Sequence, residues 1–271
     1  MADSSIFVGA HTLIMGIVNV TPDSFSDGGR YFDLESALAH ARHLIEAGAD
    51  ILDIGGESSR PGSDPISIDE ELRRVVPAVQ ALAGVCGVPL SIDTTKPDVA
   101  AECLRHGARI VNDIGGLRDP EMMRVTASHN ASAVIMHMQG TPKTMQREPV
   151  YADVIAEVKQ FLVERVAAAK SAGVRDVCVD PGIGFGKTAA HNFEILRRLD
   201  EFQSIGCPVL VGPSRKSFLG TSKGRLEVRE RLEGTLAAAV IAALKGASVV
   251  RVHDVAACRR ALQVADAVRQ Q

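Results

Sequence analysis

The sequence predicts an α/β fold, a single (β/α)8 TIM barrel with a closed parallel sheet, and three observations support this prediction. The chain has 271 residues with 46% hydrophobic content, and a barrel of this kind takes roughly 250 residues around one large core. Eight short runs rich in Ile and Val alternate with longer helical segments. The short runs are almost continuously apolar until their carboxyl ends, which is typical of strands that helices cover on both faces.

The predicted strands follow one another without an excess strand that could form an open edge. They are Leu13–Val20, Ile51–Gly55, Leu90–Thr94, Ile110–Ile114, Ala133–Met138, Val177–Asp180, Val209–Gly212 and Val249–Val252. We therefore expect a closed barrel, and we expect residues 1–271 to form one domain.

The predicted helices lie between these strands. In the first, Leu34, Leu38 and Ala41 recur at the spacing of one helix face. The others are Asp69–Leu82, Pro97–His106, Asp119–His129, Tyr151–Ala172, His191–Phe202, Glu227–Leu244 and Val255–Val268. Glycine stands at several helix ends, at positions 48, 107, 173 and 246, where a left-handed residue commonly stops a helix.

An open dinucleotide-binding sheet would show the same alternation of strands and helices. Its fingerprint, G-x-G-x-x-G after the first strand, is absent, because the loop from Asn19 to Gly29 reads NVTPDSFSDGG. The first loop therefore favours the barrel.

Charge and cysteine usage narrow the function further. The net charge is −3 and 23% of residues are charged, so neither nucleic acid nor a membrane surface is an expected partner. The five cysteines form no C-x-x-C pair and are expected to be free thiols. The longest apolar run, Leu236–Leu244, has nine residues, well short of the ~20 that cross a bilayer. We expect a soluble, cytoplasmic protein.

Polar side chains gather at the carboxyl ends of the predicted strands, where barrel active sites lie. They are Asn19, Asp53, Glu57, Asp93, Asn112, His137, Asp180, Ser214, Arg215, Lys216, Arg251 and His253. A buried charge is costly unless it is paired. Carboxylates that face Lys216 and Arg251 would satisfy this requirement and would form a site for a polar heterocycle with an anionic group.

Two long connections follow the first and second strands. They are Thr21–Phe32 and Glu57–Ile68, and both contain glycine. Long polar loops at this end of a barrel are often lids, so we expect both loops to be mobile and functional.

Two apparent motifs carry no function. Residues 181–188 read PGIGFGKT, but a phosphate loop needs glycine where Pro181 stands. His40 and His43 are three apart on a helix, but no third metal ligand is evident.

The chain resembles the dihydropteroate synthases, which are pterin-binding TIM-barrel enzymes. The segments that carry the resemblance run over nearly the whole chain: Met15–Gly29, Asp53–Gly62, Ser91–Pro97, Val111–Ile114, Met136–Gly140, Asp180–Lys187, Ser214–Ser217 and Arg251–Asp254. The first and last are the most specific. Ser59 stands where many members have threonine, which retains the hydroxyl.

The resemblance implies a transferase of folate biosynthesis. Its substrates would be 6-hydroxymethyl-7,8-dihydropterin diphosphate and p-aminobenzoate, and its products 7,8-dihydropteroate and pyrophosphate. Sulfonamides would be competitive inhibitors, and the enzyme would be a homodimer.

The resemblance also implies the site residues. The pterin would be held by Asp93, Asn112, Met138, Asp180, Phe185, Gly212 and Lys216, with Asp93, Asn112, Asp180 and Lys216 in catalytic roles. The diphosphate would bind Asn19, Arg251 and His253. The p-aminobenzoate pocket would comprise Phe25, Ser59, Arg60, Pro61, Phe185, Lys216 and Ser217.

The implied cofactor is Mg²⁺, with Asn19 as its protein ligand. A single neutral ligand predicts weak affinity for the ion without the diphosphate. The family reaction is dissociative, so Asp93 would stabilise the positive charge that develops when pyrophosphate leaves. Ser217 lies near a predicted helix start, where a carboxylate could bind.

Two other functions remain open at this point. A methyltetrahydrofolate–corrinoid methyltransferase would share the deep pterin contacts but would have no use for a diphosphate clamp at Asn19, Arg251 and His253. A noncatalytic pterin-binding barrel would bind without turnover.

Overall fold

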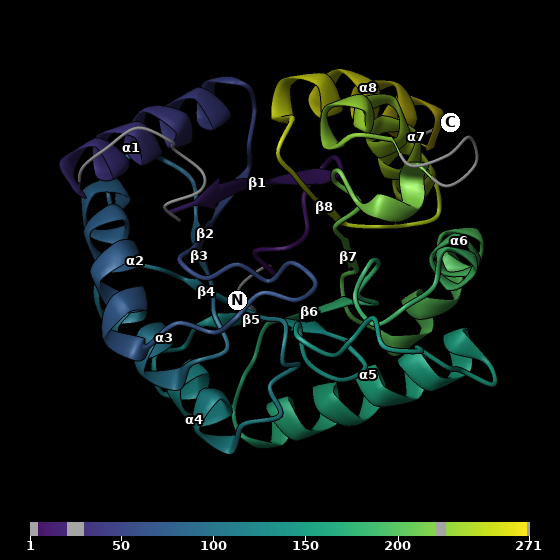
Figure 1. Cartoon of the computed structure of the whole chain (residues 1–271), viewed down its shortest axis with the longest axis horizontal. Helices are drawn as coiled ribbons and strands as arrows, with labels where there is room; N and C mark the ends of the chain where they lie inside the picture. Colours follow the sequence, from purple (N-terminus) through teal and green to yellow (C-terminus); the bar gives the residue numbers. More distant parts are fainter. Residues whose placement is uncertain (1–4, 21–29, 221–225, 270–271) are drawn as a thin grey trace.

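The computed structural model describes residues 5–20, 30–220 and 226–269, and side chains of the first helix from residue 34 onward. Eight strands form one parallel sheet in the order β6-β5-β4-β3-β2-β1-β8-β7. A parallel bridge between Val179 and Val209 joins β6 to β7, so the sheet closes into a barrel that the helices surround (Figure 1). The predicted fold class is confirmed.

The strands lie close to their predicted positions. They are β1 Leu13–Asn19, β2 Ile51–Gly55, β3 Leu90–Asp93, β4 Ile110–Asp113, β5 Ser132–Met136, β6 Val177–Asp180, β7 Leu210–Val211 and β8 Val249–Val252. The predicted seventh strand was too long, since Val209 makes only the single bridge to β6 and Gly212 lies beyond the strand.

The helices follow the predicted order. They are α1 Arg30–Glu46, α2 Ile68–Leu82, α3 Pro97–Arg105, α4 Pro120–Ser128, α5 Val154–Ser171, α6 Ala189–Arg197, α7 Leu232–Leu244 and α8 Val255–Arg269. The first connection is shorter than predicted, because α1 begins at Arg30. Its remaining residues, 21–29, lie outside the described part of the chain.

The predicted boundaries of the fifth and sixth helices were wrong for local reasons. α5 begins at Val154, because the Asp153 carboxylate caps it by accepting from the amides of Ile155 and Ala156. The predicted sixth helix divides into α6 and the 3-10 helix η2, Leu199–Ile205, which ends at the left-handed Gly206.

The predicted seventh helix begins later than expected. Residues Val228–Glu230 form a separate 3-10 turn, η4, before α7. The predicted helix start near Ser217 is a four-residue 3-10 turn, η3 Ser217–Gly220, so it lacks the aligned peptide dipoles that the carboxylate site would need.

The barrel interior has an apolar floor and a polar upper layer. The floor comprises Phe7, Leu13, Met15, Ile51, Ile110, Val134, Cys178, Leu210 and Val249, all buried. One layer higher, the register pairs Ile17 with Asp53 and Asp53 with Ser91. Polar side chains therefore begin inside the sheet, where the environment is otherwise apolar.

Between the sheet and the helices lies a second, larger apolar layer. Gly16 illustrates how closely the layers pack, because a Cβ at this position would lie 3.2 Å from Leu44 and 3.3 Å from Ala49 and Val255. No described helix is long and apolar enough to span a membrane. The five cysteines are all free thiols.

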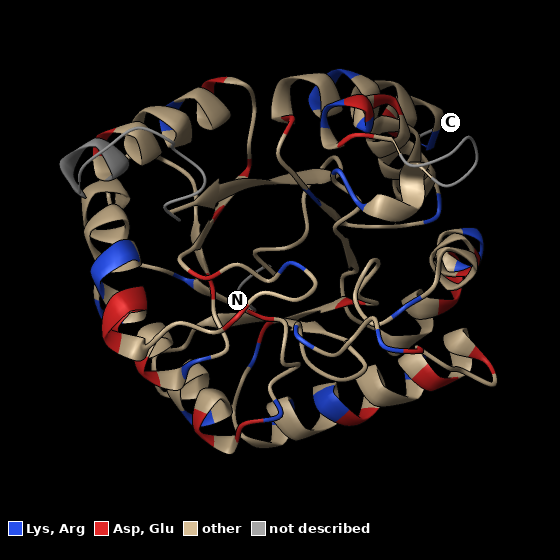
Figure 2. Cartoon of the chain, in the orientation of Figure 1, with Lys and Arg blue, Asp and Glu red and all other residues tan. Residues whose placement is uncertain are grey.

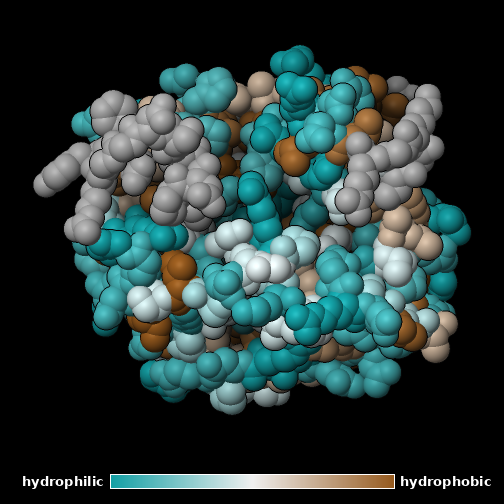
Figure 3. Space-filling view, viewed as in Figure 1, coloured by the Kyte–Doolittle hydropathy of each residue, from teal (hydrophilic) through white to brown (hydrophobic). Residues whose placement is uncertain are grey.

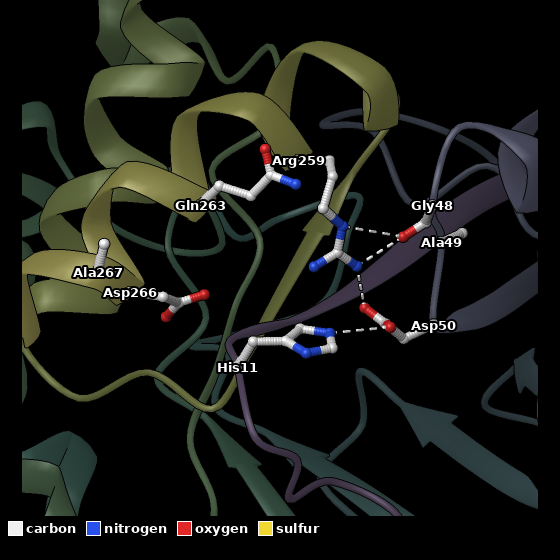
Figure 4. A pocket seen from close by; sticks show the side chains of 8 residues that line it. All are labelled: His11, Gly48, Ala49, Asp50, Arg259, Gln263, Asp266 and Ala267. Carbon is white, nitrogen blue, oxygen red and sulfur yellow. Dashed lines mark hydrogen bonds and ion pairs between the residues drawn. The ribbon is translucent and has the colours of Figure 1, made fainter. Parts of the chain in front are cut away.

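A hollow of about 510 Å³ lies at the amino ends of β1 and β2, far from the polar strand ends (Figure 4). Its groups satisfy one another. Arg259 donates to the Gly48 carbonyl and pairs with Asp50, and His11 contacts the same carboxylate at 3.1 Å. Asp50 also accepts from the Ile14 amide at 2.7 Å. The hollow therefore belongs to the contacts that join α8 to the start of the sheet.

Asp266 on α8 joins the end of the chain to its beginning. Its buried carboxylate accepts from the Thr12 amide at 3.0 Å and from the Thr12 hydroxyl at 2.6 Å. Both donors lie just before β1.

Asp266→Ala is expected to lower the free energy of unfolding by about 2 kcal/mol, because it leaves the buried Thr12 donors without an acceptor. Urea unfolding of the purified variant measures this loss. Glu35→Ala, which removes an exposed carboxylate from α1, serves as the control and should change the value by less than ~0.5 kcal/mol. Equal values for Asp266→Ala and the parent chain would contradict this account.

Candidate active site

Arg251 lies at the centre of the polar layer. It projects from β8 into the barrel, where its Nε donates to Asp53 on β2 at 2.6 Å and its Nη2 donates to Asp93 on β3 at 2.6 Å. Asp53 is fully buried, and the Arg251 side chain is 21% exposed. One cation therefore compensates two carboxylates that could not both remain ionised here alone.

Asn112 completes this cluster from β4. Its side-chain amide donates to the same Asp53 oxygen at 3.0 Å, and the sheet register places it beside Asp93. The other Asp53 oxygen and the Ser91 hydroxyl have no hydrogen-bond partner among the described residues. The cluster thus holds Arg251 and Asn112 in place and still has unused acceptor and donor capacity.

Glycines leave space beside the cluster. A Cβ on Gly55 would lie 3.5 Å from the Asp93 Cβ and 3.8 Å from the Asn19 side-chain oxygen. A Cβ on Gly212 would lie 3.8 Å from the Arg251 Cβ. The two bare positions therefore leave room around Asp93, Asn19 and Arg251.

Asp180 ends β6, and Lys216 follows β7, the strand that pairs with the Arg251 strand β8. The Lys216 ammonium lies 3.8 Å from the centre of the Phe185 ring, a cation–π contact. One Asp180 oxygen accepts from the Gly182 amide at 2.7 Å. Figure 2 shows charged residues around the middle of the barrel as well as on the outer helices.

Burial shifts the titration of these groups toward their neutral forms. It raises the pKa of Asp180 to about 6, against the opposing effect of the Gly182 amide and Lys216. It lowers the pKa of Lys216 to about 8, helped by Arg251. Burial and the nearby Asp53 raise the pKa of Asp93 to about 7, although Arg251 opposes this. Such shifts are typical of functional sites.

His253 follows β8 and is held by Ser214. The Ser214 hydroxyl accepts from the His253 amide at 3.1 Å and lies 2.9 Å from His253 Nδ1. Assigning the hydroxyl as the donor to Nδ1 places the ring proton on Nε2. Burial lowers the pKa of His253 to about 3, so the ring is a neutral donor through Nε2.

Arg215 shapes the turn that carries Ser214 and Lys216. Its φ is +57°, which is uncommon for a residue with a side chain. A bidentate pair with Asp254, at 3.0 and 2.6 Å, and a bond from its amide to the Thr235 hydroxyl hold it. Strain of this kind persists where neighbours fix it, often at functional sites.

The predicted pocket wall is apolar. Met138 is buried in a small cluster with Ile114, Met136, Met145 and the partly buried Phe185. The cluster lies at the strand ends, separate from the barrel floor. It gives the polar groups an apolar, poorly hydrated neighbour.

The loop after β2 is fastened at its base. The Glu57 carboxylate accepts from the Ile66 amide at 2.8 Å and from the Lys96 ammonium at 2.6 Å. Lys96 also pairs with the buried Glu71 on α2 at 2.5 Å. One carboxylate therefore joins both ends of the loop 57–66 to the loop that follows β3.

The tip of the same loop reaches the connection after β5. The Gly62 amide donates to the Pro142 carbonyl at 3.1 Å, and Asp64 pairs with Lys143 at 2.6 Å. Ser59 is half-buried, whereas Arg60 and Pro61 are exposed. In Figure 3 the surface over the middle of the barrel is mainly hydrophilic.

The structure thus gathers most of the predicted site residues at one end of the barrel. Asn19, Asp93, Asn112, Asp180, Lys216, Arg251 and His253 lie at or just beyond strand ends. Ser217 is exposed at the start of η3. Phe25, predicted for the p-aminobenzoate pocket, lies outside the described residues.

Comparisons with known proteins agree with this geometry. The model of the family "Pterin binding enzyme" matches residues 15–253. The chain belongs to the pterin binding enzyme family. It is similar to the dihydropteroate synthase of Escherichia coli K12, with 48% identity over 95% of this chain and 92% of that protein.

Solved structures of dihydropteroate synthases are also similar to this chain, in sequence and in fold. A Xanthomonas albilineans dihydropteroate synthase with 4-aminobenzoic acid is 46% identical, covers 96% of this chain and 94% of that one, and superposes with a TM-score of 0.90. A Yersinia pestis dihydropteroate synthase in a sulfonamide drug complex is 43% identical, covers 97% and 96%, and has a TM-score of 0.91.

Two features of this pterin binding enzyme escaped the sequence analysis. Asp53 was noted only as a polar residue within a strand, although it holds both Arg251 and Asn112. Its position three residues into an otherwise apolar strand was the available signal. His137 was grouped with the strand-end residues, but its ring accepts from the buried Lys187.

Glu57→Ala is expected to speed hydrogen exchange of the Ile66 amide by roughly tenfold or more, because a bond to a charged acceptor is lost. Exchange followed by mass spectrometry measures it. Asp64→Ala is the matched control in the same loop, since its pair with Lys143 is exposed and should contribute little. Equal exchange in the two variants would show that Glu57 does not fasten the loop.

Proposed function

We propose that this chain catalyses the dihydropteroate synthase reaction. The enzyme joins 6-hydroxymethyl-7,8-dihydropterin diphosphate to p-aminobenzoate, forms a bond from the pterin methylene carbon to the aryl nitrogen, and releases pyrophosphate. The observation that carries the proposal is the buried cluster of Asp53, Asp93, Asn112 and Arg251 beside Lys216 and Asp180, in a chain that belongs to the pterin binding family.

The pterin ring would lie between Asp93, Asn112, Asp180 and Lys216. Its edge carries amino and ring N–H donors, which carboxylates accept, and carbonyl and nitrogen acceptors, which Asn and Lys serve. Met138 and Phe185 would contact the ring faces, and Gly212 would leave room for them. A site that pairs every polar group rejects analogues that lack one.

The diphosphate would lie at Arg251 and His253. A guanidinium suits bidentate contact with phosphate, and the neutral His253 donates through Nε2. Diphosphate binding would draw Arg251 partly away from Asp93, because one guanidinium would then serve three anionic groups.

The residues present fit Mg²⁺ that is bound chiefly by substrate. The Asn19 side-chain oxygen lies at the end of β1 beside Gly55, and the described residues contain no cluster of three His, Cys, Asp or Glu that could hold a metal alone. Mg²⁺ prefers oxygen ligands and retains water while it bridges phosphates. When bound, it would stabilise the leaving pyrophosphate.

Asp93 would act on the charge that develops at the pterin. As pyrophosphate leaves, the pterin methylene becomes positively charged, and an ionised Asp93 stabilises it electrostatically. The aryl amine then attacks this carbon and loses a proton to solvent. The amine is nucleophilic without prior deprotonation, so no basic dyad is needed.

The p-aminobenzoate would bind above the pterin, between the loop 57–66 and the turn at Lys216. Ser59, Arg60, Pro61, Phe185 and Ser217 would frame it, together with Phe25 from the first connection. Sulfonamides would compete for this position, since the similar Yersinia pestis dihydropteroate synthase forms a complex with a sulfonamide drug.

We further propose that the enzyme is a cytoplasmic homodimer. Five free thiols suit a reducing compartment. Exposed aliphatic side chains gather on the neighbouring helices α7 and α8: Ile241, Leu244, Val264 and Val268 are 44–66% exposed. A second copy would remove this apolar surface from water.

A corrinoid methyltransferase would use the same deep pterin contacts. It gives no reason for Arg251 and the Ser214-oriented His253 to lie together beside the pterin site. Pyrophosphate release separates the two activities directly.

Turnover of the purified chain with both substrates and Mg²⁺ tests the proposed function, with 7,8-dihydropteroate detected by mass. We expect product only when both substrates are present. Asp93→Ala and Lys216→Ala should lower kcat/KM by about 10²-fold or more, since each removes a buried charged contact. Lys170→Ala, at an exposed position on α5, is the control. Pterin binding by folded protein without product would exclude the synthase.

The pH profile of kcat/KM tests the ionisation of Asp93. Since burial raises its pKa to about 7, protonation below that pH removes the negative charge, and log kcat/KM should fall by about one per pH unit. Asp93→Asn should lower the plateau and leave an acid limb near pH 6, where Asp180 titrates. An unchanged limb near pH 7 in Asp93→Asn would contradict this assignment.

A further inference from the structure

Lys187 is a buried lysine that the proposed reaction does not use. Burial lowers its pKa to about 7, and both its ammonium and its neutral amine form donate hydrogen bonds. Lys187 ends the glycine-rich segment after β6 that resembles a phosphate loop, and it is 2% exposed. Its ammonium donates to the carbonyls of Gly182 and Phe185 at 3.0 Å and lies 3.0 Å from His137 Nδ1. Backbone amides surround an anion in a phosphate loop. Here the carbonyls of the loop accept from the side-chain nitrogen of its own lysine.

His137 is suited to accept a hydrogen bond from the Lys187 side-chain nitrogen. Burial, with the nearby Lys187 and Arg118 charges, lowers the pKa of His137 to about 3, so the ring is neutral and Nδ1 is an acceptor. The ring meets Phe161 edge-on, with centroids 5.0 Å apart. The His137 carbonyl oxygen is a second acceptor, 3.3 Å from the Lys187 side-chain nitrogen. The end of β5 therefore provides two acceptors for Lys187.

The glycines show how tightly the segment is held. A Cβ on Gly182 would lie 1.9 Å from the His137 carbonyl oxygen, and one on Gly184 would lie 2.7 Å from the Lys216 side chain. Their φ angles are +70° and +83°, which glycine adopts without strain. At these two glycines, backbone without a side chain lies against the end of β5 and against Lys216.

The segment contacts two groups of the pterin site. The Gly182 amide donates to Asp180, and the Phe185 ring lies against the Lys216 ammonium. Both contacts depend on the backbone conformation of residues 182–186. Lys187 bonds to the carbonyls of the same two residues, so its ammonium fixes the two points from which the contacts are made.

We propose that Lys187 is a positioning residue of the reaction, whose ammonium fixes residues 182–186 so that Asp180 and Lys216 are held at the pterin site. This inference rests on the proposed function for its kinetic consequence. The structural part, that Lys187 orders the segment, stands without it.

A fluorescence experiment tests the structural part. The chain has no Trp, so Phe185→Trp places a single reporter in the segment. In this background Lys187→Met should raise the acrylamide quenching constant at least twofold and shift emission to the red. Lys170→Met, which removes an exposed lysine from α5, should change neither. Equal quenching in the two variants would overturn the proposal.

Kinetics with the natural Phe185 test the functional part. Lys187→Met should raise KM for the pterin diphosphate at least tenfold with a smaller fall in kcat, because displaced Asp180 and Lys216 weaken ground-state and transition-state binding alike. Loss of folded protein alone would lower kcat and leave KM unchanged. A normal KM in Lys187→Met would overturn the positioning role.

His137→Phe carries the same test if Lys187→Met does not fold, since it removes the Nδ1 acceptor and retains a ring against Phe161. His137→Asn, which supplies an oxygen in place of Nδ1, should retain more pterin affinity than His137→Phe, and the reverse order would count against the proposal. If the parent chain gave no dihydropteroate, the proposed function would fail, whereas the quenching result would still decide whether Lys187 orders the segment.

Discussion

The Arg251 guanidinium, shared between Asp53 and Asp93, is the interaction on which the rest of the site depends. Buried carboxylates are tolerated only when a cation and hydrogen-bond donors compensate them. Arg251 supplies the cation from β8, and Asn112 supplies a donor from β4. These residues come from opposite parts of the sequence, so only a closed barrel with this register brings them together.

This constraint determines the surroundings. Gly55 and Gly212 leave space beside the cluster, and Met138 with Phe185 gives it an apolar wall. Low hydration shifts the pKa values of Asp93 and Asp180 upward and that of Lys216 downward. Charges held in such an environment interact strongly with a ligand that replaces the missing water. The cluster is therefore costly to bury in the folded chain, and the same burial favours recognition of a polar heterocycle.

Much of this arrangement could be predicted from sequence because parallel strands place their carboxyl ends at one edge. Asp93, Asn112, Asp180 and Arg251 each ended an apolar run, and their proximity followed from the barrel. Contacts across the barrel could not be predicted, since no spacing rule links Arg251 to Asp53 or Lys187 to His137. Helix starts failed where a cap decided them: Asp153 moved the start of α5. The glycine-rich segment was rightly rejected as a phosphate loop, but its pattern did not reveal that its lysine faces inward.

A double-mutant cycle between Asp53 and Arg251 tests the central claim most directly. Asp53→Asn, Arg251→Gln and the double variant would be compared by calorimetric titration with the pterin diphosphate. If Asp53 acts by holding Arg251, the second substitution should cost little once the first is made. We predict a coupling energy of about 1.5 kcal/mol or more, a factor of about ten in Kd. Losses that add to within about 0.5 kcal/mol would show that the two residues act independently, and would contradict the account.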